Sequence, residues 1–262
     1  MINYKRLYER VGSVIGWDFS KITKRMKVVG KKWEFFQTVK NHVNKETILL
    51  DIGTGGGELL LKIAPYVKKA YGIDNSKGML ATAKKNLAKS KIRNVKFKLA
   101  DAKKIPYPDE YFDIVICRHA PFFAKELFRV LKPEGFFITQ QVGEKDKQNI
   151  KNVFGRGQSF GEKSGTKVNK YIRELKNLGF KILKKDAYNA TEYYANMEDL
   201  IFLLKNTPII PDFDIEKDRK FLKEIERKYK TKTGIKTNSF RFLIICKKPA
   251  QQLSSPSARR VR

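Results

Sequence analysis

The chain has 262 residues, of which 41% are hydrophobic and 32% charged, and its formal net charge is +29 at pH 7. These values are typical of a soluble globular protein with one large core, alone or with a small accessory unit. No run of 18 apolar residues occurs, and the basic N-terminus lacks the apolar stretch of a secretory signal. We therefore expect no membrane span and a cytoplasmic protein.

The net charge has two interpretations. A basic surface could attract RNA as a partner through counterion release. Lysines that are spread along the chain, without an aromatic-interleaved motif, are equally typical of composition alone. The sequence leaves both interpretations open, and it does not predict the oligomeric state.

Residues 1–44 precede the first predicted strand and carry two groups of apolar residues at helical spacing, within 8–17 and 35–43. We expect an N-terminal helical segment. It could cover a ligand site as a lid, or simply pack against the domain as an added helix.

From residue 45 onward, short apolar runs alternate with amphipathic segments, which predicts a parallel sheet with helices on both faces. The runs are nearly continuous, as expected for strands that are buried on both sides. The predicted strands are 47–52, 70–74, 95–99, 113–117 and 136–142, with helices at 57–65, 77–90 and 121–132.

The remainder completes one domain over 45–248. Gly155, Gly157 and Gly161 predict a flexible loop over 144–163 near the mouth of the site. A helix at 166–178, a strand at 180–188, an insertion at 195–230 with helices at 197–204 and 215–229, and an antiparallel last strand at 240–246 follow. The result is a mostly parallel, seven-stranded α/β sheet, and residues 249–262 are expected to be a disordered tail.

A glycine-rich turn is the most informative motif. The first strand ends in Asp51, and Gly53, Gly55 and Gly57 follow before an amphipathic segment. Glycine is needed where the backbone adopts positive φ or lies against a ligand. Asp74, 19 residues after Gly55 at the end of the next strand, suits a pair of ribose hydroxyls. The motif predicts a nucleoside site.

The spacing argues against dinucleotides and nucleotide phosphates. The dinucleotide fingerprint requires a third glycine, but Glu58 or Leu60 stands at that position, depending on which glycine begins the motif. No Gly-Lys-Ser/Thr follows, as a phosphate loop would require. A ligand with a nucleoside and without a pyrophosphate fits best.

At these residues the chain resembles the class I S-adenosylmethionine-dependent methyltransferases, most closely the type 11 branch typified by the ubiquinone/menaquinone-biosynthesis enzymes. The segments that carry the resemblance occur in order within about residues 45–143, namely 51–57, 71–80, 99–102, 112–118 and 126–138. The resemblance implies a Rossmann-like fold and S-adenosyl-L-methionine as cofactor, without a metal.

The resemblance also implies roles for cofactor-binding residues. The turn from Asp51 through Gly53, Gly55 and Gly57 would wrap the methionine part, and Asp74 would hold the ribose. Met79 would pack on the adenine, whose edge Asp101 and the backbone N–H of Ala102 would read.

The residues alone leave structural roles open for the same positions. Asp74 could serve as a helix N-terminal acid, and Asp101 as an ordinary loop acid. Asp51 could stabilise the glycine turn, and Met79 could belong to the core.

The methyl acceptor is expected where the fourth strand ends. His119 is the candidate catalytic residue, because a neutral imidazole could remove a proton from the acceptor; it could also cap the next helix. Arg118 could bind an acidic substrate or pair with a local carboxylate such as Asp113. Cys117 ends an apolar strand and is not expected to be a nucleophile. Tyr194 and neighbouring aromatic residues could line an acceptor pocket or simply pack.

The expected function is methylation of a small organic molecule. RNA methylation is the alternative, and a non-catalytic cofactor-binding protein on the same fold is a third reading.

Overall fold

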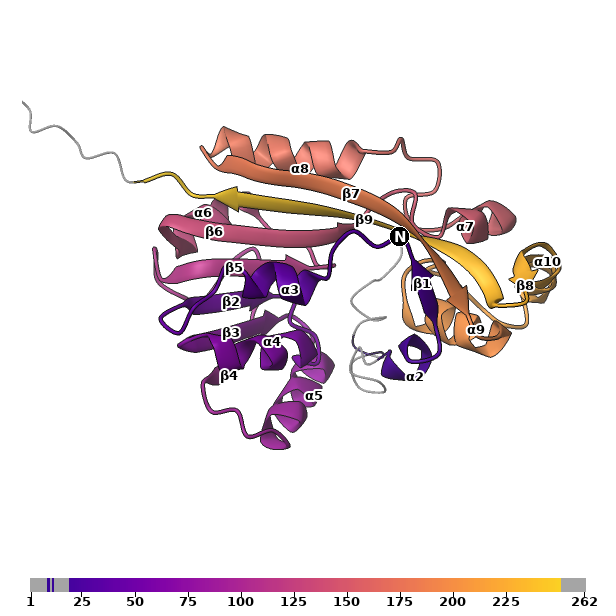
Figure 1. Ribbon diagram of the computed structural model, residues 1–262, viewed down its shortest axis with the longest axis horizontal. Coiled ribbons are helices and arrows are strands. Elements are labelled where there is room, and N and C mark those ends of the chain that lie inside the picture. Colours follow the sequence, from indigo (N-terminus) through magenta and orange to yellow (C-terminus); the bar gives the residue numbers. More distant parts are fainter. Residues whose placement is uncertain (1–8, 10, 12–18, 251–262) are drawn as a thin grey trace, which may run out of the picture.

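The computed structural model describes Glu9, Val11 and residues 19–250 (Figure 1). Its centre is a nine-stranded sheet in the order β1-β7-β9-β6-β5-β2-β3-β4, with β8 paired to β9. The strands are β1 Lys27–Val29, β2 Ile48–Ile52, β3 Lys69–Asp74, β4 Val95–Leu99, β5 Phe112–Arg118, β6 Leu131–Val142, β7 Lys181–Tyr194, β8 Lys230–Thr231 and β9 Gly234–Lys247. The predicted α/β class is confirmed. The short strands β1 and β8 are additional to the seven expected.

Strands β4, β3, β2, β5 and β6 are parallel, whereas β9 runs antiparallel to both β6 and β7. The central strands are buried apolar runs, and Leu49, Leu50, Val115 and Ile116 have no exposed surface. Edge strand β4 is different, because its two lysines, Lys96 and Lys98, leave it half exposed.

Helices cover both faces of the sheet (Figure 1). Those in the described residues are α2 Ser20–Thr23, α3 Phe35–Lys40, α4 Glu58–Ile63, α5 Lys77–Ala88, α6 Ala124–Val130, α7 Gln148–Phe154, α8 Thr166–Asn177, α9 Met197–Asn206 and α10 Arg219–Tyr229. α3, α4 and α5 pack on one face, where Leu60 and Ile63 meet Leu49. α6 and α8 cover the other face, where Leu127 and Leu175 share a core. None of these helices is long and apolar enough to cross a membrane.

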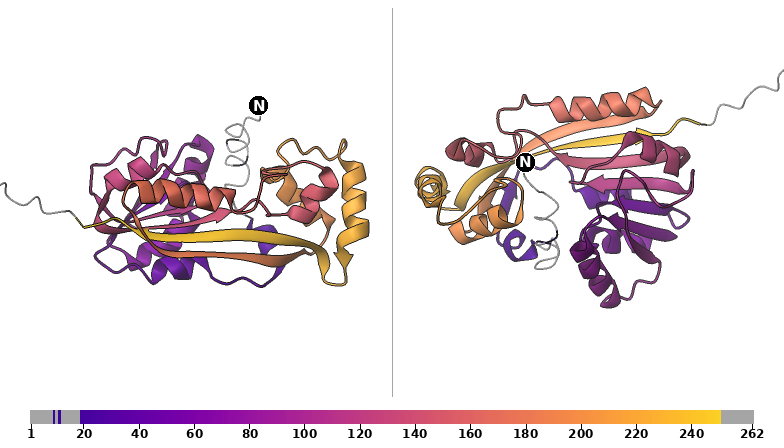
Figure 2. Two further views of the ribbon diagram at one scale, coloured as in Figure 1. Left: turned by 90° about the horizontal axis from the view of Figure 1, so that it is seen from above. Right: turned by 180° about the vertical axis from the view of Figure 1, so that it is seen from behind.

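Strands β7 and β9 extend well beyond the central sheet. β6 ends where Val142 pairs with Arg241, but the β7–β9 pairing continues to Tyr194 and Ile235. α2, α7, α9 and α10 surround this extension and form a third core, as the views in Figure 2 show. We call these four helices and the distal ends of β7 and β9 the accessory layer. It stands beyond the carboxyl ends of the parallel strands.

The expected loop at 144–163 is wrong for residues 148–154, which form α7. Ile150 and Phe154 are buried in the core of the accessory layer. Lys151 is also buried, and its Nζ donates to the carbonyl oxygens of Glu144 and Gln158 at 2.6 and 3.1 Å. The loop was expected because of three glycines that follow this helix, whereas Ile150 and Phe154 recur at helical spacing before them. The expected helix at 8–17, except for Glu9 and Val11, and most of the expected tail lie outside the described residues.

Candidate active site

The sheet brings the predicted cofactor residues together at its carboxyl edge. Ile52, the last residue of β2, pairs with Ile73 on one side and with Cys117 on the other. The amides of Gly53 and Thr54 both donate to the carbonyl of Ile73, at 2.9 and 3.0 Å. The glycine turn therefore lies between the ends of β3 and β5.

Two glycines of this turn are required by packing as well as by conformation. Gly53 has φ +70°, and a Cβ there would lie 2.2 Å from the Cβ of Ala120. Gly57 has φ +78°, and its Cβ would lie 2.6 Å from the ring of Phe97. The turn thus approaches both the segment after β5 and the edge strand β4 more closely than a side chain allows.

Asp74 holds the turn with both carboxylate oxygens. Oδ2 accepts from the amide of Gly55 and Oδ1 from the amide of Ser76, each at 2.9 Å. A carboxylate has about four lone-pair sites, so roughly two remain for further donors. The side chain is half-buried, and burial raises its pKa. Asp74 is placed to accept from a pair of hydroxyls.

The other predicted adenosine residues surround Asp74. The amide of Ala100 donates to the carbonyl of Asp74 at 3.0 Å, which places Asp101 and the half-buried Ala102 beside it. Asp101 is exposed, and its Oδ1 accepts from the amide of Lys103 at 2.8 Å, closing a local turn. Met79 is only 3% exposed, so it offers little surface to a ligand.

Glu9 reaches this site from the N-terminal segment. Its carboxylate accepts from the Ser76 hydroxyl and from the amides of Lys77 and Gly78, at 3.1–3.3 Å. An anion at the first turn of α5 is favoured by the helix dipole. The sequence did not single out Glu9.

Asp51 lies beneath the turn and is 2% exposed. Burial, the largest influence, raises the pKa of this carboxyl to about 7. Asp51 is therefore a carboxyl whose charge a nearby cation would stabilise.

A chain of hydrogen bonds fixes the tautomer of His119. The indole N–H of Trp33 can only donate, and it lies 2.8 Å from Oε1 of Gln140. The amide nitrogen of Gln140 then faces Nε2 of His119 at 3.0 Å and must be the donor. His119 therefore accepts at Nε2 and carries its proton on Nδ1.

The surroundings keep His119 neutral. Burial, followed by the nearby charges of Arg241 and Arg118, lowers its pKa well below the ordinary value of 6.5. The backbone of His119 is also fixed, because its amide donates to the carbonyl of Gln140 at 2.9 Å. His119 has a φ of +59°, in the left-handed region. This arrangement favours a hydrogen-bond donor at Nδ1 over the proton-removing role expected from the sequence.

Arg118 ends β5 with an exposed side chain. The expected pairing with Asp113 is wrong: Asp113 instead binds Nζ of Lys132 and the amide of Ile48, both at 2.7 Å. Within residues 19–250, Glu9 and Val11, the guanidinium of Arg118 has neither an ion pair nor a hydrogen bond. Cys117 just before it is buried, which raises the pKa of its thiol to about 12 and rules out a ready nucleophile.

Buried ion pairs join the site to the accessory layer. Arg241 pairs with Asp146, and Lys147 pairs with Glu192. The hydroxyl of Tyr194 also donates to Glu192 at 3.0 Å, which makes Tyr194 a packing residue with a satisfied polar end.

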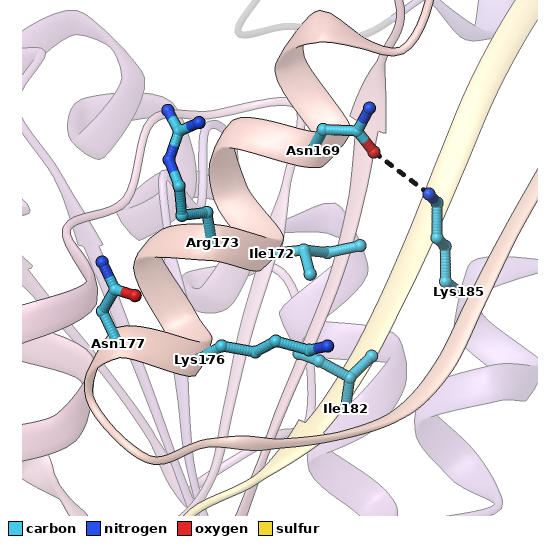
Figure 3. A pocket seen from close by; sticks show the side chains of 7 residues that line it. All are labelled: Asn169, Ile172, Arg173, Lys176, Asn177, Ile182 and Lys185. Carbon is cyan, nitrogen blue, oxygen red and sulfur yellow. Dashed lines mark hydrogen bonds between the residues drawn. The ribbon is translucent and has the colours of Figure 1, made fainter.

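A depression elsewhere on the surface lies between α8 and β7 (Figure 3). Asn169 and Lys185 meet across it at 3.1 Å, and the charged side chains that line it are basic. None of the predicted site residues lines this depression, so it is separate from the carboxyl edge.

The family model described as a methyltransferase domain matches residues 43–185, more than half of the chain. The chain belongs to this methyltransferase family. The cofactor of these class I methyltransferases is S-adenosylmethionine, and the resemblance stated from the sequence is confirmed.

Curated relatives include the uncharacterized methyltransferase YcgJ of Bacillus subtilis, 36% identical over 97 residues, which are 34% of this chain and 38% of YcgJ. A demethylmenaquinone methyltransferase of Symbiobacterium thermophilum is 33% identical over 125 residues, 44% of this chain and 50% of that protein.

Solved structures agree with the methyltransferase fold. A putative methyltransferase from Bacillus halodurans has a TM-score of 0.62 at 21% identity, covering 82% of this chain and 99% of that one. YcgJ from Bacillus subtilis has a TM-score of 0.59 at 22% identity, covering 82% and 97%. The chain matches about half or less of the length of the first curated relatives.

The sequence missed the residues that surround His119. Gln140 and Gln141 interrupt an otherwise apolar strand, and this polar pair was a readable signal. No sequence signal pointed to Trp33 or Arg241. Each reaches the site through a partner far away in the sequence, Gln140 for Trp33 and Val142 for Arg241.

Proposed function

We propose that the methyltransferase transfers a methyl group from S-adenosylmethionine to a small organic acceptor held beside Arg118 and His119. The observation that carries the proposal is Asp74, half-buried at the carboxyl edge with acceptor capacity left after it binds Gly55 and Ser76. The acceptor site then lies two strands further, beyond β2, at the end of β5.

The residues present fit the cofactor. The close approach of the turn at Gly53 leaves backbone where a side chain would otherwise stand. Asp74 would hold the ribose, and Asp101 with Ala102 would lie along the adenine edge. The partly protonated Asp51 would lie toward the amino end of the methionine part.

The bound sulfonium supplies an already activated methyl group, so the protein mainly positions the acceptor and excludes water. His119 is held in one tautomer for hydrogen bonding, and the buried Cys117 takes no part in the chemistry.

Calorimetry with S-adenosylhomocysteine tests the cofactor half. Asp74→Ala removes the acceptors for the ribose, and we expect no measurable binding. Asp109→Ala is the control, because Asp109 is exposed and, among the described residues, forms its ion pair with Arg129 of α6. Unchanged affinity in Asp74→Ala would refute the assignment.

Labelled cofactor tests the acceptor half. Incubation of the full chain with cell extract, followed by separation into RNA and small-molecule fractions, should place the label in the small molecules. Label in the RNA would instead favour the RNA alternative.

A further inference from the structure

We propose that Arg118 and the Nδ1–H of His119 bind a carboxylate of the methyl acceptor, so that the acceptor is a small organic acid. This inference rests on the proposed function and names its substrate class. It starts from Arg118, an exposed residue whose guanidinium has no ion pair or hydrogen bond among the described residues and whose pKa is lowered by burial of that end of the side chain.

Two of the charged residues that act on Arg118 are already paired, since Arg241 binds Asp146 and Glu34 binds Lys31. The third, Asp51, is a buried carboxyl whose pKa burial raises to about 7. Within the described part of the chain, Arg118 is the charge at this edge whose planar donors are left unused. A guanidinium binds a carboxylate through two parallel hydrogen bonds, which makes an acid its natural partner.

His119 supplies a second donor at the same place. Gln140 pairs with Arg118 across β5 and β6, and its side chain occupies Nε2 of His119. The proton is thereby kept on Nδ1, for which the structure gives no acceptor among the described residues. A base would need a free lone pair, whereas this imidazole presents an N–H.

Aromatic surface lies beside these donors. Trp33 is hydrogen-bonded to Gln140, the β6 partner of Arg118, and its ring lies 4.5 Å from that of the buried Tyr188. Trp33 is half-buried, so part of its surface faces outward. An acid with an apolar body fits this combination better than a small inorganic anion does.

The methionine end of the cofactor also carries a carboxylate, and its chemistry is the same. Arg118 follows Cys117, the partner of Ile52 just before the glycine turn, and pairs on its other side with Gln140 of β6. The acceptor is favoured by Trp33, because its hydrogen bond to Gln140 places an aromatic ring on the β6 side of Arg118. The two sources can be separated by measuring cofactor and acid affinities independently.

The test uses the full chain labelled with ¹⁵N-histidine, which has only His42 and His119. With S-adenosylhomocysteine present, it is titrated with acetate, benzoate and indole-3-acetate, each compared with its neutral amide. His42 is the internal reference, because its Nδ1 lies 2.8 Å from the carbonyl of Thr38. We expect at least one acid to shift the Nδ1 resonance of His119 saturably, while its amide and His42 show no such change.

Variants of Arg118 complete the test. Arg118→Gln should weaken the binding of that acid at least tenfold, with S-adenosylhomocysteine affinity within twofold of the parent. Equal binding of acid and amide, or no saturable shift with any of the three acids, overturns the proposal. A tenfold loss of S-adenosylhomocysteine affinity in Arg118→Gln also overturns it, because Arg118 would then hold the cofactor. A parent chain that fails to bind S-adenosylhomocysteine refutes the proposed function itself.

Discussion

The amide of Gly55 donates to Oδ2 of Asp74 at 2.9 Å, which ties the turn after β2 to the end of β3. One carboxylate thus shapes the glycine turn, and in the proposed function it would also hold the ribose. Its structural and binding roles can be separated by a substitution that preserves its shape.

Asp74→Asn should bind S-adenosylhomocysteine at least tenfold more weakly than the parent. The amide keeps one oxygen for the turn but loses the charge and half of the acceptor sites, and a hydrogen bond to a charged group contributes about 1.5–3 kcal/mol. Calorimetry gives the affinity, and circular dichroism should show an unchanged fold. Equal affinities would mean that the charge of Asp74 serves only the turn.

Gly53→Ala should lower the free energy of unfolding more than the same substitution at a glycine with open space around it. Its Cβ would lie 2.2 Å from that of Ala120, in addition to the strain of φ +70°. Gly161 is the matched control, because it has φ +81° and nothing within 4 Å of its added Cβ. We expect Gly161→Ala to lower the free energy of unfolding by about 1–2 kcal/mol, and Gly53→Ala to lower it further. Urea unfolding of the two variants measures the difference; equal losses would contradict the close approach.

Asp51 should make both stability and cofactor binding depend on pH. Its pKa is about 7 in the folded protein and 3.8 as its ordinary value. Between these values the folded state keeps a proton that the unfolded state has lost, so stability falls as pH rises from about 4 to 7, by up to about 4 kcal/mol. Asp51→Asn should remove this decline in urea unfolding.

The ammonium of the cofactor would favour the charged form of Asp51. Binding of S-adenosylhomocysteine near pH 6.5 should therefore release protons, measurable by calorimetry in buffers of different ionisation enthalpy. Proton release that persists in Asp51→Asn would assign it to another group.

The buried pair of Lys147 and Glu192 should give the opposite pH dependence. Desolvation alone would raise the pKa of Glu192, but Lys147 and other partners lower it to about 2. The stability that this carboxylate contributes is present above about pH 4.5 and is lost as pH falls toward 2, about 3 kcal/mol in all. Lys147→Met should cost about 3–5 kcal/mol at pH 7, because it leaves a buried charge without its partner.

Lys145→Met is the control for this substitution, since Lys145 is exposed two residues away. Urea unfolding at pH 7 compares the two variants. Similar stabilities would show that Glu192 is sustained by Arg241 without Lys147.

The cofactor half of the fold could be predicted from the sequence because its signals are local. β4 occupies 95–99 as expected, and α5 begins at residue 77 as expected, where its N-cap Ser76 accepts from the amide of Met79 at 3.2 Å. Apolar runs, glycines and caps report on their own segments, so the succession of strands and helices along the chain followed from them.

The acceptor half could not be predicted in the same way. Trp33 and Gln140 are separated by 107 residues, and their contact depends on how α3 and β6 are placed. The distal ends of β7 and β9, which pair with the short strands β1 and β8, mix polar and apolar residues. A pattern of continuous apolar runs therefore predicts strands that end too early.

The extension of β7 and β9 couples the unfolding of the central sheet to that of the accessory layer. The same two strands lie in the central sheet and in the core of the accessory layer, where Tyr194 and Ile235 are buried. Neither core can melt without releasing the pairing that supports the other. Heating should accordingly reveal one cooperative transition, and excision of residues 195–230 should yield an insoluble remnant in place of a smaller enzyme.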